Sequence, residues 1–412
     1  MMASAAPRVL AIHRYYWPDT PPYASILRVI VQHWHESGAR TEVFSSQPSY
    51  KLGVTIDRRP PREVVDGTAV RRVTLPRDRG RITKAFNMMM FTLAAAGHVL
   101  WRRRNVVMCS TSPPVVLGAA VSWAAKLRGA RFVYHCMDLH PEIGALSGDF
   151  AQPLIYRMLY RLELGTCRRA AAIVVLSQDM RRAVLERDTA LDDRIVVLNN
   201  PDLPEFGTDP AKDANPSSGQ RLRVVFTGNL GRFQGLEAVV DGIRDLAHEA
   251  DIELILMGDG AARADLVSRA ESFPTGARAS VTVLPHASSA EARELMRTAD
   301  LGLVTLQPGV IRLAYPSKTM TYLSEGLPLL VGVEADSELA ATVRAEGIGF
   351  VLEALDAAAV RTTLLALTHR TDEIERMRPR AAAYAARSGA REVVLRRWHE
   401  LLDDLVATEV PT

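Results

Sequence analysis

Apolar and polar residues along this chain follow a repeating order, in which a short apolar run is followed by a longer stretch with helical spacing. The short runs indicate buried strands and the longer stretches indicate amphipathic helices, as in strand-helix-strand units. The helical stretches include residues 24–37 and 115–127. We expect two series of strands: the first at residues 9–13, 41–45, 106–110, 132–136, 172–176 and 195–198, the second at 222–227, 252–257, 281–284, 301–305, 329–332 and 349–351. The pattern predicts an α/β protein with two parallel sheets.

A break in the pattern separates the two series. Residues 200–220 are rich in Pro, Asp, Ser and Gly and have no periodicity, which is typical of a linker. A chain of 412 residues also exceeds what one hydrophobic core usually organises. We therefore predict Rossmann-like domains at residues 1–205 and 206–389. A last helix, at about residues 390–412, should pack back across the linker because it carries one apolar stripe, formed by Val394, Trp398, Leu401, Leu402 and Leu405.

Composition narrows the class of protein. Hydrophobic residues at 48% and charged residues at 24% are ordinary for a soluble globular protein. Cys109, Cys136 and Cys167 have no paired spacing, which favours reduced core thiols over a disulfide frame or a zinc site. The first residues contain no apolar run of secretory length, so we expect a cytoplasmic protein.

The net charge of +3 conceals an asymmetry. Residues 1–205 contain 28 Lys and Arg against 18 Asp and Glu, or +10, and the remainder contains 22 against 29, or −7. A basic first half suits a phosphate-bearing acceptor or an anionic membrane surface, although a plain solvated basic face would look the same. We expect no nucleic-acid partner.

One segment of the first half, residues 85–101, is unusually apolar. Its clearly polar residues are Asn87, Thr92 and His98. The segment is short for crossing a bilayer, which takes about 20 apolar residues. It predicts either a helix at the membrane interface, on the inner face of the cytoplasmic membrane, or a core helix with basic ends. The basic flanks are Arg77, Arg79, Arg81, Lys84, Arg102, Arg103 and Arg104.

Two loops of the second half are rich in glycine where strands end, which is where parallel sheets bind ligands. In residues 226–236, Gly228, Gly231 and Gly235 would let the backbone approach a ligand, and Arg232 favours an anion over a bare tight turn. The second loop, MGDG at residues 257–260, is a weaker signal. Gly258 and Gly260 also fit a simple turn in which Asp259 caps the next helix.

Residues 313–328, LAYPSKTMTYLSEGLP, are the strongest candidate for binding a diphosphate. Pro316 and Ser317 are good helix-start residues, so the turn should present free NH groups, with Lys318 as a mobile cation beside them. Thr321 and Glu325 are four residues apart on one helical face, suited to hydroxyl groups of a ribose or sugar. An ordinary capped helix with a surface lysine is the alternative.

The order of these motifs resembles a family. GNLGRFQGL, MGDG, Ala299 with Asp300 and then PSKTMTYLSEGLP are similar to the donor domain of family-four retaining glycosyltransferases, which have the GT-B fold of two Rossmann-like domains facing a cleft. The segments RYYWPDTPPYASILRV (residues 14–29) and YHCMDLHPE (residues 134–142) resemble the bacterial polysaccharide branch, which includes O-antigen and colanic-acid glycosyltransferases. The resemblance covers nearly the whole chain.

The resemblance implies a nucleotide-diphosphate sugar bound by the second domain, with a UDP-sugar favoured, and an acceptor bound by the first. Lys318 and Arg232 would neutralise the leaving phosphates, and backbone near Leu284 and Pro285 would contact the base. Thr321 stands where relatives often have a ribose-binding glutamate. The diphosphate loop would comprise Gly228, Asn229, Gly231, Arg232 and Gln234.

Catalysis by the first domain is implied in the same way. His135 would face the donor sugar, and Asp138 would polarise the acceptor or hold the histidine, unless it only caps a loop. Glu142 belongs to the same stretch. Transfer would retain the anomeric configuration and need no metal, since no Asp-x-Asp follows an apolar strand and no cofactor is implied. The transferred unit would be a hexosyl or N-acetylhexosaminyl group.

Aromatic residues beyond the first strand are acceptor-site candidates, because their faces suit sugar rings or a polyprenyl chain, although ordinary packing explains them equally. Asp19 and Arg28 could contact acceptor hydroxyls or a phosphate. The aromatic candidates are Tyr15, Tyr16, Trp17 and Tyr23. A lipid-linked saccharide is the expected acceptor, and a soluble natural product is the second choice. A non-hydrolysing nucleotide-sugar epimerase and a non-catalytic nucleotide or sugar sensor remain as rival functions.

Overall fold

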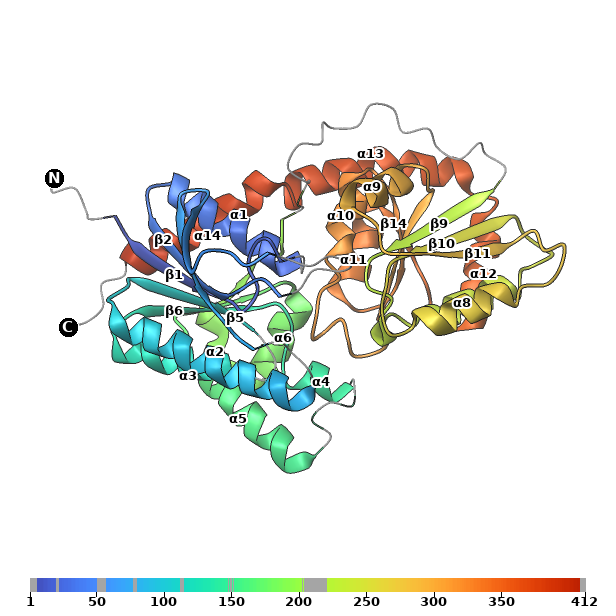
Figure 1. Ribbon diagram of the computed structural model, residues 1–412. Helices are drawn as coiled ribbons and strands as arrows, with labels where there is room; N and C mark the ends of the chain where they lie inside the picture. Colours follow the sequence, from blue (N-terminus) through green and yellow to red (C-terminus); the bar gives the residue numbers. More distant parts are fainter. Residues whose placement is uncertain are drawn as a thin grey trace. The chain divides into compact units, whose positions relative to one another are not determined.

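The computed structural model describes residues 6–19, 22–49, 57–76, 80–111, 115–146, 148, 150, 152–201, 203 and 221–407 (Figure 1). The chain divides into two compact domains. The first contains Met1–Pro201 together with Glu392–Thr412, and the second contains Asp202–Arg391. Most of the predicted linker and the last residues of the predicted terminal helix lie outside the described residues.

The first domain is built on an eight-stranded sheet in the order β3-β4-β2-β1-β5-β6-β7-β8. All neighbouring strands are parallel except β3 and β4, which are antiparallel. The apolar runs form its central strands because their side chains are buried on both faces, as expected of a parallel sheet. The strands are β1 (Arg8–Ile12), β2 (Arg40–Ser46), β3 (Arg62–Val65), β4 (Thr68–Val73), β5 (Val106–Ser110), β6 (Arg131–Cys136), β7 (Ala172–Val175) and β8 (Ile195–Val197).

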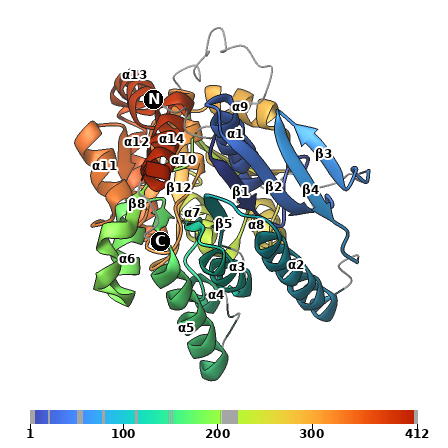
Figure 2. The same ribbon diagram turned by 90° about the vertical axis from the view of Figure 1, so that its left-hand side faces the viewer.

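Helices cover both faces of this sheet (Figure 2). Successive side chains of β6 show the two faces: the Tyr134 hydroxyl contacts Glu163 of α5, and the His135 ring contacts Trp398 of α14. Helices α2, α3 and α5 pack side by side on the first face. The helices of the domain are α1 (Pro22–Glu36), α2 (Arg81–Trp101), α3 (Val116–Leu127), α4 (Glu142–Leu146), α5 (Pro153–Arg169), α6 (Gln178–Arg187), the 3₁₀ turn η1 (Thr189–Arg194) and α14 (Arg391–Ala407).

Helix α14 belongs to the first domain although it ends the chain. Trp398 is 1% exposed, its ring packs edge-on against Trp34 of α1, and its carbonyl accepts a hydrogen bond from Trp34 Nε1 at 3.1 Å. Val394, Leu395 and Leu402 are buried beside it. The apolar stripe of the last helix therefore completes the core between α1 and the sheet.

The second domain contains a six-stranded, fully parallel sheet in the order β11-β10-β9-β12-β13-β14. Side chains alternate between two cores: Val224 and Phe226 pack with α7, α8 and α12, whereas Val225 packs with α9, α10 and α11. The strands are β9 (Leu222–Thr227), β10 (Ile252–Met257), β11 (Ser280–Leu284), β12 (Leu301–Thr305), β13 (Leu329–Gly332) and β14 (Gly349–Val351). The helices are α7 (Leu236–Arg244), α8 (Arg263–Glu271), α9 (Ser289–Arg297), α10 (Lys318–Ser324), α11 (Glu338–Glu346), α12 (Ala357–Leu367) and α13 (Thr371–Ser388), with the 3₁₀ turn η2 (Arg232–Gln234) after β9.

The predicted α/β architecture is confirmed, and every predicted strand is present to within one residue at each end. The prediction missed β3 and β4. These two strands form the edge of the first sheet and contain Arg62, Arg71 and Arg72, which interrupt the apolar run that marks a buried strand.

Candidate functional site

The three loops that follow β9, β10 and β11 are joined by backbone hydrogen bonds at one edge of the second sheet. Gly228 N donates to Met257 O at 2.9 Å, and Gly258 N donates to Leu284 O at 3.2 Å. Leu230 N donates to Asp259 O at 2.9 Å. The two glycine motifs and the strand end at Leu284 and Pro285 therefore form one surface, at the edge where parallel sheets bind ligands.

Close approach explains why two of these positions need glycine. A Cβ atom on Gly258 would lie 1.8 Å from the carbonyl oxygen of Gly228. A Cβ on Gly260 would lie 2.4 Å from the carbonyl oxygen of Leu230. Neither position has room for a side chain, so the glycines bring the two loops together. The alternative of a simple turn in which Asp259 caps a helix is not what the structure shows, because Asp259 Oδ1 accepts from Gly260 N and α8 begins only at Arg263.

Polar side chains converge within the first of these loops. Asn229 Nδ2 and Gln234 Oε1 both come within 2.9 Å of the position that a Cβ on Gly231 would take. The Gln234 Oε1 atom is buried and has no hydrogen-bond partner among the described residues. Arg232, on η2, is exposed. A buried acceptor without a partner in the described residues makes Gln234 a candidate for contact with a polar ligand.

Lys318 lies at the root of the same loop but is not the mobile surface cation that we expected. Its Nζ atom is 3.2 Å from the centre of the Phe226 ring, and Phe226 lies two residues before Gly228 on β9. The surrounding protein desolvates the ammonium and lowers the pKa of Lys318 well below its usual range. The ring contact holds the lysine in place, and an anion beside it would supply a counter-charge.

The start of α10 differs from the expected open helix end. Ser317 has αR geometry and its side chain makes no capping hydrogen bond, and Thr319 N already donates to Pro316 O at 3.0 Å. The fixed position of α10 comes instead from Tyr322, whose hydroxyl accepts a hydrogen bond from Thr227 N at 2.8 Å. The sequence prediction missed Tyr322, since an apolar helical pattern alone does not reveal this bond.

Glu325 must be removed from the predicted donor contacts. Its carboxylate is paired with Arg293 at 2.5 Å and with Arg297 at 2.7 Å, both on α9. These pairs tie the end of α10 to α9, so the carboxylate is not available to sugar hydroxyls. Thr321 is half-buried one turn earlier on the same helix and remains a candidate.

His135 lies on β6, in the strand where it was predicted. It is 1% exposed, with its Nδ1 3.1 Å from the Tyr23 hydroxyl and its ring against Trp398. Burial lowers the pKa of His135 to about 3, so the ring is neutral. Side chains of the first domain enclose the ring, and its contact with a donor sugar stays a prediction.

Asp138 lies where the first-domain site was expected, just beyond β6. Met137 N and Asp138 N both donate to Thr111 Oγ1, at 3.1 and 3.4 Å, which joins the ends of β5 and β6. Asp138 is half-buried, and desolvation raises the pKa of its carboxyl to about 6. A carboxyl poised near neutral pH at the carboxyl edge of a parallel sheet is a candidate for catalysis.

Comparison with known proteins identifies the family. The model of the glycosyl transferase 4-like domain matches residues 5–201. The probable glycosyltransferase WbjE of Pseudomonas aeruginosa is 27% identical over 277 residues, covering 65% of this chain and 67% of its own length. The putative colanic acid biosynthesis glycosyl transferase WcaI of Escherichia coli K12 is 25% identical over 312 residues, covering 72% of this chain and 73% of its own. The first domain therefore matches the glycosyl transferase 4-like family, and the chain is a glycosyltransferase.

The fold of this glycosyltransferase agrees with solved structures. The crystal structure of HepE from Anabaena in complex with UDP has a TM-score of 0.67 at 13% identity, and the match covers 96% of this chain and all of that one. The predicted GT-B fold and the predicted glycosyltransferase activity are confirmed.

The predicted acceptor contacts of this glycosyltransferase divide into buried and half-buried groups. Tyr16 and Tyr23 are core residues, 0% and 8% exposed, which corrects their prediction as surface platforms. Trp17 is half-buried between two guanidinium groups, those of Arg28 at 4.8 Å and Arg59 at 5.1 Å from its ring centre. These contacts stiffen Trp17 by cation–π attraction. Trp17 therefore remains an acceptor candidate.

The charged members of the predicted acceptor set have partners within the domain. Arg28 pairs with Asp66 at 2.6 Å, and Glu142 pairs with Arg187 at 2.7 Å. Asp19 is 3% exposed, and its Oδ1 accepts from Ser49 N at 2.9 Å. These contacts fix the three side chains within the first domain, and their contact with an acceptor stays a prediction. Tyr15 is half-buried and stays a candidate.

Proposed function

We propose that this glycosyltransferase transfers a hexosyl or N-acetylhexosaminyl group from a UDP-sugar to a saccharide or polyprenyl-linked acceptor. The second domain would bind the donor and the first the acceptor. The observation that carries the proposal is the meeting of the Gly228 and Gly258 loops beside the desolvated ammonium of Lys318. The HepE structure, which contains UDP, supports the choice of nucleotide.

Sugar transfer with retained configuration requires that the bond between the anomeric carbon and the diphosphate oxygen breaks while negative charge on that oxygen is stabilised. Lys318 would supply a fixed cation at the root of the loop, and Arg232 would supply a movable one above it. Preorganised charges of this kind are the largest single contribution to many enzymes' catalysis. In the proposed reaction the acceptor oxygen bonds to the anomeric carbon from the face that the diphosphate leaves, and its proton passes to the leaving phosphate oxygen.

In the first domain, Asp138 is the residue that we propose takes part in the reaction. Its carboxyl, with a pKa of about 6, would be mostly ionised at neutral pH and could hold the acceptor hydroxyl in position for attack. His135 would act through Tyr23 and Trp398, by keeping the end of β6 in place. We propose that no metal takes part, since Lys318 and Arg232 can neutralise the diphosphate.

Nucleotide binding tests the first half of the proposal. Thermal unfolding of the wild-type protein should be measured with UDP, GDP and ADP in turn. A nucleotide at 100 times its dissociation constant adds about 2.7 kcal/mol of stability, so UDP should raise the melting temperature of the second domain by several degrees. Equal shifts for all three nucleotides, or none for any, would contradict a UDP-sugar donor.

Transfer itself is tested with a UDP-sugar in the presence and absence of a polyprenyl-diphosphate-linked saccharide. UDP release that depends on the acceptor, together with a lengthened lipid-linked glycan, is the expected result. Formation of an epimer from the donor alone would instead indicate the epimerase, and binding without any turnover would indicate a sensor. Each of these two outcomes overturns the proposal.

A further inference from the structure

Exposed large apolar side chains are concentrated on one part of the first domain. Among the described residues fourteen such side chains are exposed, and thirteen of them lie on helices α2 to α5. The remaining one is Val64 on β3, and the described part of the second domain has none. A patch of this kind is rare on a monomer that works free in water and marks an interaction surface.

Helix α2 carries most of this surface, and its apolar residues follow helical spacing on two faces. Phe91, Ala95 and Val99 are buried on the sheet side. The opposite stripe is exposed and also apolar, which departs from the polar outer face of an ordinary core helix. Exposed fractions on that stripe reach 88% at Ile82, 66% at Leu93 and 80% at Trp101, and its members are Ile82, Phe86, Met89, Met90, Leu93, Leu100 and Trp101.

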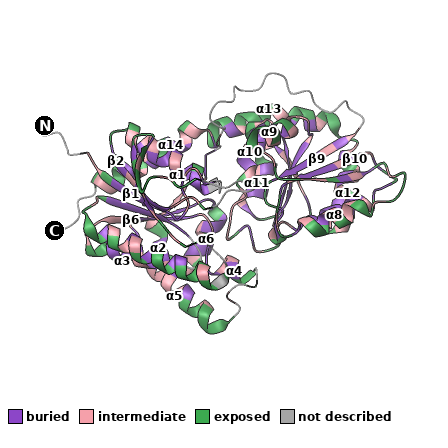
Figure 3. Ribbon diagram, in the orientation of Figure 1, coloured by how far each residue is buried: buried purple, intermediate pink, exposed green. Residues whose placement is uncertain are grey.

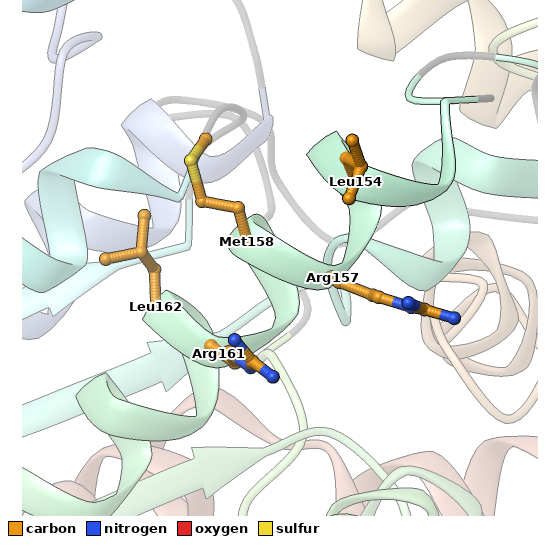
Figure 4. A pocket seen from close by; sticks show the side chains of 5 residues that line it. All are labelled: Leu154, Arg157, Met158, Arg161 and Leu162. Carbon is orange, nitrogen blue, oxygen red and sulfur yellow. The ribbon is translucent and has the colours of Figure 1, made fainter.

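Helices α3 and α5 extend the surface beside α2 (Figure 3). On α3, Trp123 and Leu127 are 52% and 71% exposed. On α5, Leu154, Ile155 and Met158 are exposed. Figure 4 shows Met158 and Leu162 on one side of this helix, with the Arg157 and Arg161 side chains extending to the other. Apolar and basic stripes therefore run side by side on α5. We call the exposed apolar side chains of α2, α3 and α5 the apolar platform.

The charged side chains of α2, α3 and α5 indicate an anionic partner for the apolar platform. The three helices contain seven Lys and Arg and a single carboxylate, Glu163. Glu163 is 0% exposed and accepts from the Tyr134 hydroxyl at 2.8 Å, so no negative side chain of these helices faces solvent. Trp123 is flanked by Arg169 at 4.8 Å and Lys126 at 5.4 Å from its ring. An apolar stripe bordered by cations, with tryptophan at its edge, matches the interface of an anionic lipid bilayer.

The composition of α2 indicates that the contact is superficial. Within the described residues, no helix is both long enough and apolar enough to cross a bilayer. The exposed stripe of α2 is instead continuous along one side of the helix, which suits a helix lying in the plane of the headgroups.

We propose that the apolar platform docks the first domain on the surface of an anionic membrane, with α2 parallel to that surface. The inference rests on the proposed lipid-linked acceptor, because docking would bring the domain that binds the acceptor to the surface from which the acceptor's diphosphate projects. Of the two interpretations that residues 85–101 leave open, the buried face of α2 bears out the core helix, and the proposal assigns its exposed apolar face to the membrane interface.

Flotation of the full-length protein with lipid vesicles tests the proposal. The wild-type protein should float with vesicles of phosphatidylcholine and phosphatidylglycerol and much less with phosphatidylcholine alone. Phe86→Gln with Leu93→Gln should weaken vesicle binding by about tenfold or more, because two exposed apolar side chains lose their burial in lipid. Val64→Gln is the matched control, since Val64 is 71% exposed but lies outside the platform, and its binding should equal that of the wild type.

The basic side chains of α5 are tested by a second double variant, which has its own matched control. Arg157→Gln with Arg161→Gln should weaken binding to anionic vesicles by about tenfold and leave the weak binding to phosphatidylcholine unchanged. Arg376→Gln with Arg396→Gln removes the same charge from exposed positions on α13 and α14 and should have no such effect. Salt should weaken binding of the wild type more than that of the Arg157 and Arg161 double variant.

Three results would overturn the proposal. The first is failure of the wild type to float with anionic vesicles; the second is equal binding by the Phe86 and Leu93 double variant. The third is a stable dimer by light scattering that the same double variant abolishes, since a second copy would then cover the platform. All variants should keep the wild-type melting temperature and UDP-induced shift, so loss of docking is distinguished from failure of the proposed function. Conversely, vesicle binding by a protein with no transferase activity would contradict only the proposed function.

Discussion

Replacing Lys318 with methionine removes the one ammonium held beside the diphosphate loop while keeping a side chain of similar length. The free protein should tolerate this change. Its desolvated ammonium is offset only by the Phe226 ring at 3.2 Å, and a desolvated cation–π contact is worth about 2 kcal/mol. Because an apolar side chain suits the same space, the melting temperature of the variant should equal or exceed that of the wild type.

The affinity of Lys318→Met for UDP should be lower than that of the wild type. A hydrogen bond to a charged group contributes about 1.5–3 kcal/mol, so Lys318→Met should weaken UDP binding by roughly 10- to 150-fold. Isothermal titration calorimetry in lipid-free buffer measures this directly. Lys126→Met is a matched control in that buffer, since it also removes an ammonium above an aromatic ring, at 5.4 Å from Trp123 in the other domain.

The pH dependence provides an independent check of the same reasoning. The folded protein lowers the pKa of Lys318, so between that value and the usual value near 10.5 the unfolded chain binds more protons than the folded one. Stability of the free wild type should therefore rise with pH across this window, and UDP affinity should fall as the ammonium loses its proton. In Lys318→Met, stability and UDP affinity should both depend less on pH across this window. UDP binding by the variant as tight as that of the wild type would refute the assignment of Lys318 to the diphosphate.

Three further changes probe other parts of the structure. Gly258→Ala places a Cβ 1.8 Å from the Gly228 carbonyl oxygen and should destabilise the second domain by about 1–3 kcal/mol or more in denaturant unfolding. Tyr322→Phe leaves Thr227 N buried without its acceptor and should cost about 1–3 kcal/mol and weaken UDP binding. Asp138→Asn should abolish most transfer, and the wild-type rate should rise with pH through about 6 as the carboxyl ionises. Burial raises the pKa of Asp138, so the folded state favours its protonated form. The contribution of Asp138 to stability should therefore fall as the pH rises from about 4 to 6, and Asp138→Asn should lack this contribution.

Each of these three variants has an outcome that would contradict its prediction, and the first two have matched control variants. Gly97→Ala adds a methyl group inside α2 where nothing lies within 4 Å and should raise stability by up to about 1 kcal/mol; a loss equal to that of Gly258→Ala would contradict the close approach. Tyr156→Phe alters a tyrosine of the other domain, and a loss equal to that of Tyr322→Phe would deny the hydrogen bond any special role. For Asp138, a variant with the wild-type rate and pH profile would remove it from catalysis.

The sequence predicted most strands because burial on both faces makes them apolar, and two candidate loops because glycine follows the ends of β9 and β10. It could not show what surrounds a polar side chain. Glu325 has the spacing of a ligand-binding residue, yet α9 supplies two arginines that occupy it. From the sequence alone Lys318 would be a surface cation, whereas in the structure its ammonium lies against the ring of Phe226 on β9. The strand of His135 was predicted correctly, but the sequence did not show that Tyr23 and Trp398 enclose its ring.

The position of α14 has a consequence for how the protein is made. Trp34 and Trp398 pack together although 364 positions separate them, so the core of the amino-terminal domain stays open until the ribosome has synthesised α14. Until then the nascent domain exposes the apolar surface that α14 will cover, which favours aggregation. Expression of this domain alone would therefore require the last helix to be supplied, either as a separate peptide or by joining it to the new terminus.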